Sequence, residues 1–303
     1  MPAVLYLVFN PVAGKGRARR ALDRTLAFLT EHGLQHTLLT TERPGHAAEL
    51  AAATPPGATV VALGGDGTVH EVVKGIVAAG GSAEGSAEPF ARTLGVVPVG
   101  SGDDFAYALG IPRDDLEGAL QRLLARRHAL VDVGFVDDEP FVNSTGVGFD
   151  AEAAHRVRTS PKAFTGLAAY LYGVLAALGD LSPADVAVTV DGELVYQGAS
   201  LLVSVQNGPR GGGNFMFAPE ARNDDGALDV VVAGAFGRLG AVSVLPRLMK
   251  GQHLSHPRVH LFRGARVELS WARPQRGHAD GEPLGPLACY RVRLQPRALR
   301  VVR

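Results

Sequence analysis

Residues 60 to 71 read Val-Val-Ala-Leu-Gly-Gly-Asp-Gly-Thr-Val-His-Glu, and this stretch decides the fold. An apolar, β-branched run ends in the glycine-rich residues 64–68, and apolar residues then recur with helical spacing from Glu71 to Ile76. This order predicts a buried strand, a glycine turn and the start of a helix. Such a turn presents backbone N–H groups and a helix N-terminus to an anion, and a phosphate can approach glycine closely because no Cβ intervenes. The stretch therefore predicts a phosphate site at the end of a strand.

Two polar side chains of this turn suit that task. Thr68 can cap the helix and offer its hydroxyl to a phosphate, and Asp66 places a carboxylate where a metal–nucleotide would lie. The alternative is an ordinary turn between a strand and a helix. The chain contains no P-loop. Residues 13–17 come closest to the pattern Gly-x-x-x-x-Gly-Lys-Ser/Thr, but they lack both its spacing and its terminal hydroxyl. The glycine turn also fails to match the dinucleotide pattern Gly-x-Gly-x-x-Gly, so the site rests on its own residues.

Composition excludes several classes of protein. The chain has 303 residues, 46% of them hydrophobic, which is enough for one large domain or two ordinary ones. Acidic and basic residues balance to zero net charge, which argues against sequence-independent nucleic-acid binding. The single Cys rules out an intramolecular disulfide and fits a reducing cytosol. Residues 1–9 lack the basic region and cleavage site of a signal peptide, so a first strand is expected there.

The most apolar segment, residues 163–178, is interrupted by Gly166 and Gly173 and is shorter than the about 20 residues of a spanning helix. A buried or half-buried helix is the favoured interpretation. The alternative is a helix that lines a lipid pocket or touches a membrane surface. The second interpretation would make the protein a peripheral membrane protein rather than an integral one.

Strands and helices alternate in the first part of the chain. This alternation predicts a mostly parallel sheet with right-handed crossovers, whose strand-end loops lie together where ligands bind. The expected strands are 4–9, 35–40, 59–63 and 93–99, and the expected helices are 17–31, 46–53 and 71–79. From about residue 130 the chain favours strands and turns. The sequence thus predicts an α/β domain at 1–130, with 290–303 as strands that can complete it, and a β-rich domain at 131–289.

Four separated motifs occur in an order that resembles one family. They are Asn10-Pro-Val-Ala-Gly14, Gly64-Gly-Asp-Gly-Thr68, Val97-Pro-Val-Gly-Ser-Gly-Asp-Asp-Phe105 and Asp280-Gly-Glu282. Together they resemble the diacylglycerol kinase catalytic-domain family, especially its soluble bacterial lipid kinases, with sphingosine kinases as relatives. The glycine motif alone is shared with NAD kinases and phosphofructokinase-like proteins. The resemblance implies an α/β nucleotide-binding domain with a phosphofructokinase/NAD-kinase-like parallel sheet, followed by a β-rich, sandwich-like domain.

By this resemblance, ATP is bound by the loops that follow the strands of the first domain. The implied ATP contacts are Asn10, Pro11, Val12, Ala13, Gly14, Thr41, Gly64, Gly65, Asp66, Gly67, Thr68, Val69, His70 and Ser101. For Thr41 a turn-forming hydroxyl is an equal alternative. The family usually has Gly-Thr-Gly-Asn-Asp-Phe where this chain has Gly100-Ser-Gly-Asp-Asp-Phe105. Ser101 keeps the hydroxyl, whereas Asp103 adds a charge that either strengthens metal binding or repels phosphate.

The resemblance also implies the catalytic carboxylates. Phosphoryl transfer to an alcohol needs a base close to the hydroxyl and a cation that offsets the phosphate charge. Glu282 matches the proposed general base, and Asp66 and Asp104 are expected to hold the catalytic Mg²⁺ with its waters. The motif alone is weak, because Asp191-Gly192-Glu193 is a second copy that reads as a simple hairpin.

Two further features remain open. Residues 219–229 resemble a family loop that binds a structural Mg²⁺ through the carboxylate of Asp225 and the carbonyls of Arg222 and Ala227, and the alternative is an acidic Asx-type turn. Four arginines after the first loop favour a solvated helix face, with steering of nucleotides or anionic headgroups as the alternative. These arginines are Arg17, Arg19, Arg20 and Arg24.

The sequence therefore predicts a cytoplasmic, ATP- and Mg²⁺-dependent kinase that associates with membranes and phosphorylates the hydroxyl of a lipid, with diacylglycerol as the first candidate. The apolar residues 164–178 are a candidate wall for acyl chains. A kinase of a soluble metabolite such as NAD and a non-catalytic lipid-binding protein are the alternatives. A homodimer is left open, and zero net charge means that attraction to anionic lipid has to come from a local patch.

Overall fold

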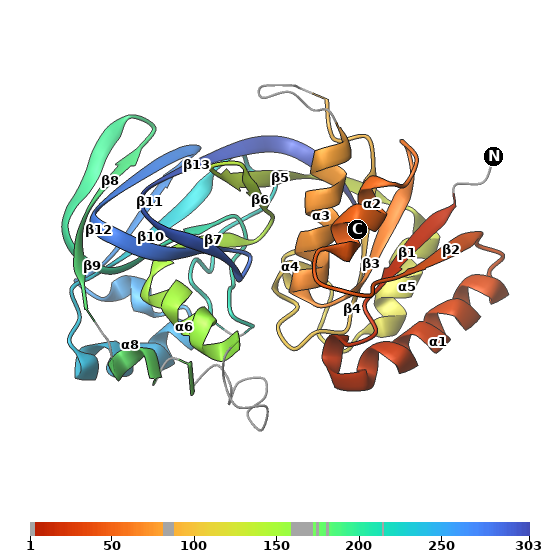
Figure 1. Ribbon diagram of the computed structural model, residues 1–303, viewed down its shortest axis with the longest axis horizontal. Coiled ribbons are helices and arrows are strands. Elements are labelled where there is room, and N and C mark those ends of the chain that lie inside the picture. Colours follow the sequence, from red (N-terminus) through yellow and green to blue (C-terminus); the bar gives the residue numbers. More distant parts are fainter. Residues whose placement is uncertain (1–3, 81–87, 159–171, 174–175, 180–181, 214) are drawn as a thin grey trace. The chain divides into compact units, whose positions relative to one another are not determined.

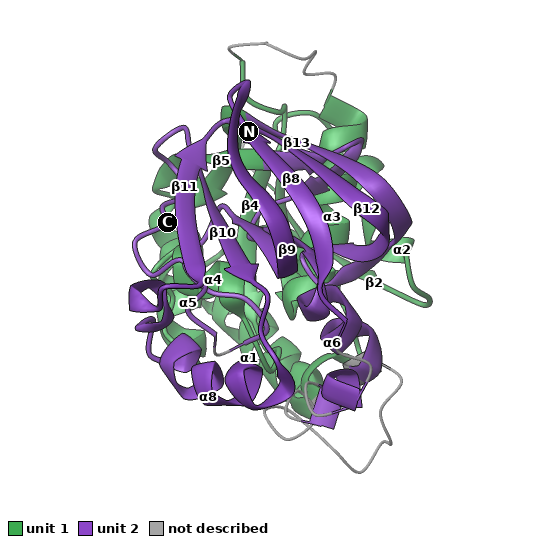
Figure 2. Cartoon of the chain, turned by 90° about the vertical axis from the view of Figure 1, so that its left-hand side faces the viewer, with its two compact units in different colours: residues 1–133, 295–303 green, residues 134–294 purple. Residues whose placement is uncertain are grey.

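The computed structural model describes residues 4–80, 88–158, 172–173, 176–179, 182–213 and 215–303. These divide into two units, residues 1–133 with 295–303 and residues 134–294 (Figure 2). The expected boundary was residue 130, and the expected returning strands were 290–303. Most of the apolar segment 163–178 lies outside the described residues.

Unit 1 is built on a parallel sheet. Its strands lie in the order β2 (His36–Thr40), β1 (Leu5–Phe9), β3 (Thr59–Gly64) and β4 (Thr93–Pro98), and the end of β13 (Glu282–Val302) pairs with β4. All of these pairs are parallel. Every residue of β3 and β4 is buried, as continuous apolar strands in the middle of a parallel sheet should be.

Helices cover both faces of this sheet (Figure 1). Helices α1 (Arg17–Glu31) and α5 (Leu116–Ala125) share a core with alternate strand residues such as Leu7, Val61 and Leu63. Helices α2 (His46–Ala52) and α3 (Asp66–Gly80) lie on the opposite face, and a short α4 (Asp104–Ala108) follows β4. The period-two alternation of the strands therefore divides their side chains between two helical layers.

The prediction that α3 begins at Glu71 was wrong. The helix begins at Asp66, because the N–H groups of Thr68 and Val69 both donate to the carbonyl of Gly65. The turn is therefore confined to Gly64 and Gly65, and Gly67 lies in the first helical turn. Thr68 consequently does not cap the helix, which corrects the expected capping role.

Unit 2 is made mainly of antiparallel strands. They are β5 (His128–Val136, which begins in unit 1), β6 (Glu139–Phe141), β7 (Ser144–Gly148), β8 (Ala184–Val190), β9 (Glu193–Gln206), β10 (Leu228–Gly234), β11 (Val259–Gly264), β12 (Arg266–Ala279) and most of β13. Both β7 and β8 pair with β9 and with β12, which closes a ring of four strands. The two long strands thus carry the sheet from one layer to the next.

Strand β10 shows how the layers of unit 2 are separated. Val230 and Val232 point into the core between the strands, whereas Val231 points into a second core under α6 (Phe149–Arg158) and α8 (Arg238–Met249). A short 3-10 helix, η2 (His253–Ser255), follows α8. Neither α6 nor α8 was expected from the sequence. Within the described residues, no helix is both long and apolar enough to cross a bilayer.

Candidate active site

Three loops of unit 1 meet at the carboxyl ends of β1, β3 and β4. The Asn10 N–H donates to Leu63 O at 3.2 Å, and the Val99 N–H donates to Gly64 O at 3.0 Å. The N–H of Phe105 donates to Asp66 Oδ1 at 3.2 Å. Because the strands are parallel neighbours, the three predicted nucleotide loops are brought together as expected.

Glycines let these loops approach one another. A Cβ at Gly14, whose φ is +58°, would lie 2.0 Å from the carbonyl oxygen of Val99. A Cβ at Gly65 would lie 3.0 Å from the Cα of Gly100. The glycines of the first and second motifs are therefore required by the packing of the loops as well as by access for a phosphate.

Asn10 and Thr68 join the first loop to α3. The Asn10 Nδ2 donates to Thr68 Oγ1 at 3.1 Å, and Asn10 Oδ1 accepts from the N–H of Val12 at 3.1 Å. Thr68 is 5% exposed, and the side chains of Val69 and His70 are buried beside it. Thr41 follows β2, and its N–H donates to Phe9 O at 2.9 Å, which sets it beside the end of β1.

Arg17 is a structural link rather than part of a solvated face. Its Nη2 donates to Gly100 O at 2.5 Å, its Nε donates to Gly14 O at 3.3 Å, and its Nη1 pairs with Asp114 at 3.1 Å. The first loop is thus fastened to the loop after β4. Ser101 is exposed in that loop, and its carbonyl accepts from Arg113.

Three carboxylates lie where the loops meet. Asp66 and Asp104 are the first residues of α3 and α4, and Asp66 accepts the N–H of Phe105, the residue after Asp104. Carboxylate oxygens in this setting are the donors that Mg²⁺ prefers. The roles of Asp66 and Asp104 as Mg²⁺ ligands stay a prediction that this arrangement fits.

Asp103, which like Asp104 is buried, completes this group. Its φ of +53° is left-handed, and its Oδ1 accepts the N–H of Gly100 at 2.9 Å. Asn and Asp tolerate this backbone conformation, and both offer an oxygen to that N–H, which explains why Asp can stand where the family usually has Asn. Burial raises the pKa of Asp103 to about 6, and the Gly100 N–H, Arg17 and Arg113 oppose the shift.

In unit 2, Glu282 follows a two-residue turn between β12 and β13. Asp280 and Gly281 have φ values of +49° and +86°, and Ala279 pairs with Glu282 across the turn. The carboxylate of Asp280 accepts three backbone N–H groups, those of Val142, Asn143 and Ser144, each at 2.9 Å. The Asp of the Asp-Gly-Glu motif therefore anchors the turn, and Glu282 remains the candidate base.

A histidine and a second carboxylate support this turn. His278 Nδ1 accepts the N–H of Gly281 at 3.2 Å, and His278 Nε2 lies 3.4 Å from Asp150 Oδ2. Because Nδ1 accepts, we assign the ring proton of the neutral imidazole to Nε2, facing Asp150. A Cβ at Gly146 would lie 1.9 Å from Asp150 Oδ2, so only glycine leaves room for this pair.

Sequence reasoning missed Asp150 and His278. The histidines had no spacing that singled them out, and Asp150 reaches His278 only because α6 packs near β12. The one local signal is that His278 stands four residues before Glu282 in a strand-turn-strand, which places it beside the turn.

The second copy of the motif has the same backbone. Asp191 and Gly192 have φ values of +51° and +91°, and Val190 pairs with Glu193, which confirms the predicted hairpin. Asp191 accepts the N–H groups of Ala265 and Arg266. Glu193 is exposed.

In the loop that was expected to bind a structural Mg²⁺, Asp225 is paired with an arginine side chain. Asp225 Oδ1 accepts the N–H of Ala227 at 3.2 Å, which is an Asx-type turn, and Asp225 Oδ2 pairs with Arg263. Both carboxylate oxygens are therefore engaged. In the described part of the chain, no three His, Cys, Asp or Glu side chains cluster as metal ligands. The ligand set of Asp225, Arg222 and Ala227 stays a prediction, and a metal there would compete with Arg263.

The fold and these loops define a phosphotransferase with an α/β nucleotide-binding unit and a β-rich second unit. Comparison with protein families identifies it further. Residues 4–136 match the diacylglycerol kinase catalytic domain, and residues 143–303 match the YegS C-terminal NAD kinase beta sandwich-like domain. The chain belongs to the diacylglycerol kinase catalytic-domain family, and it is a kinase that uses ATP and transfers phosphate to an alcohol group.

Individual relatives agree with this assignment. A diacylglycerol kinase from Bacillus subtilis is 29% identical over 283 residues, which cover 93% of this chain and 90% of that protein. The crystal structure of a diacylglycerol kinase from Bacillus anthracis has a TM-score of 0.71 at 21% identity, covering 99% of this chain and 96% of that one. An NAD kinase from Archaeoglobus fulgidus in complex with ATP has a TM-score of 0.50 at 12% identity, covering 99% and 93%. These structures confirm the predicted fold class.

The raised pKa of Asp103 predicts a pH-dependent effect of Asp103→Asn on stability. The folded pKa of about 6 lies above the ordinary value of 3.8, so ionising Asp103 costs the folded state free energy as the pH rises through this window. Asp103→Asn keeps the acceptor for Gly100 and should raise the unfolding free energy by on the order of 1–3 kcal/mol above about pH 7, with no gain below about pH 4. Urea unfolding across this pH range measures the difference. The exposed Asp23→Asn is the control, and an equal gain at low pH would contradict the prediction.

The ion pair of Arg263 predicts how the loop responds to Mg²⁺. Arg263→Met should lower the melting temperature by roughly 2–4 °C, because a half-exposed pair contributes about 1 kcal/mol. Mg²⁺ should restore this loss, whereas EDTA should leave the wild type unchanged. Arg266→Met is the neighbouring control. If EDTA lowers the melting temperature of the wild type but not that of the Asp225→Asn variant, a metal is held beside Arg263, which would contradict the prediction.

Proposed function

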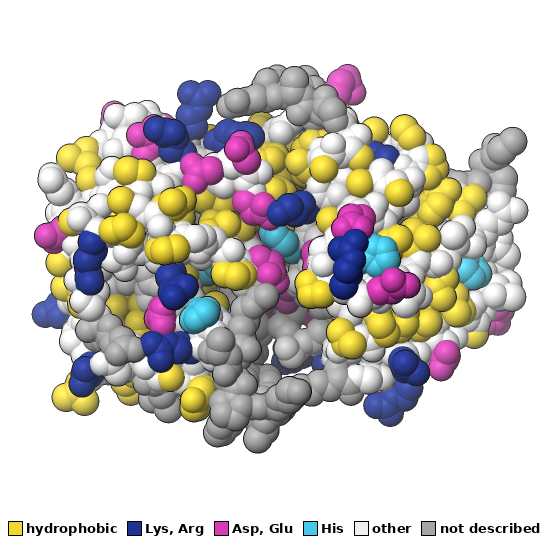
Figure 3. Space-filling model, in the orientation of Figure 1, with side chains coloured by type: hydrophobic (Ala, Val, Ile, Leu, Met, Phe, Trp, Pro, Cys, Tyr) yellow, Lys and Arg dark blue, Asp and Glu magenta, His cyan; other side chains and the backbone are white. Residues whose placement is uncertain are grey.

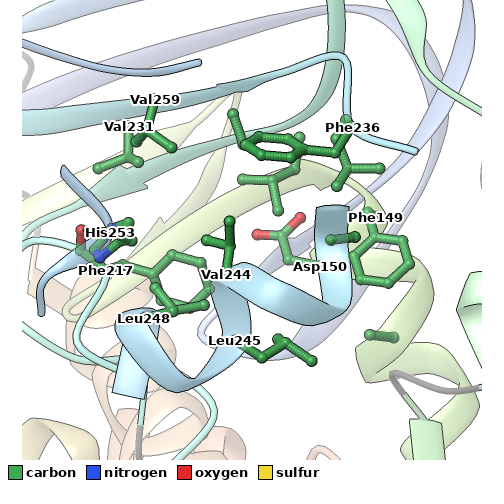
Figure 4. A pocket seen from close by; sticks show the side chains of 15 residues that line it. Phe149, Asp150, Phe217, Val231, Phe236, Val244, Leu245, Leu248, His253 and Val259 are labelled. Carbon is green, nitrogen blue, oxygen red and sulfur yellow. Dashed lines mark hydrogen bonds between the residues drawn. The ribbon is translucent and has the colours of Figure 1, made fainter. Parts of the chain in front are cut away.

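We propose that this kinase transfers the γ-phosphate of ATP to the hydroxyl of a membrane lipid, with diacylglycerol as the first candidate acceptor. The observation that carries the proposal is a cavity of about 70 Å³ in unit 2 (Figure 4). Its lining is almost entirely aliphatic and aromatic, with residues such as Phe217, Phe236 and Leu248. Such a lining suits an acyl chain, because burying apolar surface is favourable and burying a phosphate without a basic partner is not.

Asp150 connects this apolar pocket to the candidate base. It lies in the pocket wall and also faces His278, which holds the N–H of Gly281 next to Glu282. A carboxylate oxygen at this place can accept a hydrogen bond from a polar headgroup. Among the described lining residues the other titratable one is His253, which bonds to Phe217 O and whose pKa is lowered by burial, which favours its neutral form.

The proposed reaction divides the work among residues already described. The glycine loops of unit 1 bind the phosphates of ATP through backbone N–H groups, and Asp66 and Asp104 would hold Mg²⁺, which would offset the charge of the transferring phosphoryl group. Glu282 accepts the proton of the lipid hydroxyl as its oxygen attacks the γ-phosphorus. The Asp280 anchor and His278 fix the turn that carries Glu282.

A kinase of a soluble metabolite is the second candidate, supported by the fold shared with NAD kinases. Among the described residues that line the pocket there is no Lys or Arg, so these residues offer no counter-charge for a dinucleotide phosphate. This favours a lipid acceptor.

Glu282→Gln should lower the rate of lipid phosphorylation by roughly 10²–10⁴-fold, because the amide cannot take up the hydroxyl proton. ATP turnover with Mg²⁺ is measured in mixed micelles with diacylglycerol, sphingosine, phosphatidylglycerol or no lipid, and with NAD as a soluble acceptor. Glu193→Gln, in the second copy of the motif, is the matched control and should keep wild-type rates. Turnover of NAD alone would reject the lipid acceptor, and equal losses in both variants would reject Glu282 as the base.

Filling the pocket should change the chain-length preference. Ala233 lies on β10 in the pocket wall, and Ala233→Phe would occupy space meant for an acyl chain. The expected result is at least a roughly tenfold loss of kcat/KM for long-chain diacylglycerol, with short-chain diacylglycerol much less affected. Equal losses for both substrates at an unchanged melting temperature would mean that the pocket does not hold the acyl chain.

A further inference from the structure

Helix α8 is apolar on two faces. Its inner face lines the pocket with Val244, Leu245 and Leu248 (Figure 4). Its outer face also carries apolar side chains: Leu239 is 88% exposed and Val242 is 42% exposed. A helix that serves only to cover the core needs just the inner face.

The exposed side chains form one stripe. At about 100° per residue, positions 239, 242, 246 and 249 fall on the same side of a helix. They are occupied by Leu239, Val242, Pro246 and Met249, all of them exposed. The stripe therefore runs the length of α8 on the side away from the pocket.

Positive charge surrounds this stripe. Between Asp229 and Glu268 the sequence contains no acidic residue, and its basic residues are Arg238, Arg247, Lys250, Arg258, Arg263 and Arg266. On the helix, Arg247 and Lys250 flank the stripe on one side and Arg238 on the other, and all three are exposed. Basic and hydrophobic side chains lie together over α8 at the lower left of Figure 3. Arg263 is paired with Asp225, so Arg238, Arg247 and Lys250 are the basic side chains that border the stripe.

We propose that the outer face of α8 docks on an anionic lipid bilayer, with Leu239, Val242 and Met249 inserted at the interface and Arg247 and Lys250 at the headgroups. An apolar stripe bordered by basic side chains is the pattern of helices that lie in the membrane interface. Each basic residue near an anionic surface strengthens binding roughly fivefold, and each apolar side chain that inserts strengthens it further.

This docking deepens the proposed function, on which its biological meaning rests. The inner face of α8 lines the acyl-chain pocket, so one helix would contact the bilayer and the acceptor lipid taken from it. The docking itself is a binding property that can be measured without turnover.

Helix α1 is the competing basic surface. Arg19, Arg20 and Arg24 are exposed on it, but Asp23 lies among them, and its large apolar residues are buried or half-buried. It therefore offers charge without an apolar stripe. Charge alone gives binding that salt screens, whereas inserted side chains add attraction that salt does not remove.

The test is co-sedimentation with vesicles of equal parts phosphatidylglycerol and phosphatidylcholine, without ATP or diacylglycerol. We expect the wild type to bind these vesicles and to bind pure phosphatidylcholine far less. The double variant Leu239→Ser/Val242→Ser should bind at least roughly tenfold more weakly, and Arg247→Gln/Lys250→Gln roughly ten- to thirty-fold more weakly. Melting temperatures should stay unchanged, because these side chains are exposed.

Two matched controls make the location of the surface testable. Leu194→Ser/Leu287→Ser removes two exposed leucines elsewhere in unit 2, and Arg19→Gln/Arg24→Gln removes two charges from α1. Both should bind within about threefold of wild type. Loss of binding in the α1 variant with full binding in the α8 variants would overturn the proposal, as would a wild type that binds neither vesicle.

A soluble short-chain diacylglycerol separates the docking from the reaction. Both α8 variants should phosphorylate this acceptor at wild-type rates, because the changed residues do not line the pocket. Vesicle binding that depends on α8, without phosphorylation of any lipid, would uphold the docking and reject the proposed function. Phosphorylation of the short-chain lipid without vesicle binding would uphold the proposed function and reject the docking.

Discussion

A Cβ atom at residue 146 would lie 1.9 Å from Asp150 Oδ2 and 2.8 Å from His278 Nε2, and a Cβ at residue 14 would lie 2.0 Å from Val99 O. Both units thus depend on space that only glycine leaves. In unit 1 the space lets the nucleotide loops nest against one another. In unit 2 it lets a buried carboxylate reach the histidine that holds the Glu282 turn. Glycine is usually credited with giving ligands access to the backbone, yet here it also lets the site's own groups reach each other.

The two Asp-Gly-Glu turns show that neither local sequence nor backbone geometry assigns a function. Both have left-handed residues at the two central positions, and in both the Asp anchors a neighbouring segment through backbone N–H groups. They differ in what lies behind them. The turn before Glu282 is backed by His278 and Asp150, and Asp150 also lines an apolar pocket. The turn before Glu193 projects an exposed side chain from a hairpin. In the proposed function, the catalytic turn is therefore the one before Glu282, because its neighbour Asp150 lines a pocket.

This contrast also explains how far the sequence could be interpreted. The parallel strands and their glycine loops were predictable, because continuous apolar runs and glycine turns are local signals. The start of α3 was misplaced because Asp-Gly-Thr resembles a turn, although Gly65 O already accepts two helical N–H groups. Helix α8 was missed because two apolar faces and Pro246 disguise its periodicity. The pair of Asp150 and His278 has no local signal beyond the spacing of His278 from Glu282, since it exists only where α6 meets β12.

Helix α8 also bears on what zero net charge means for a protein that works on lipids. A uniformly basic protein would bind nucleic acids and membranes indiscriminately, whereas a neutral one with an acid-free segment such as residues 230–267 can present that segment to an anionic surface. The apolar stripe then decides the kind of surface, because charge attracts at a distance and only insertion rewards contact with acyl chains. In the proposed docking, the helix that carries the stripe also lines the pocket with its other face, which would couple orientation at the membrane to access for the lipid. The charge balance of the whole chain and the imbalance of this one segment are therefore parts of the same arrangement.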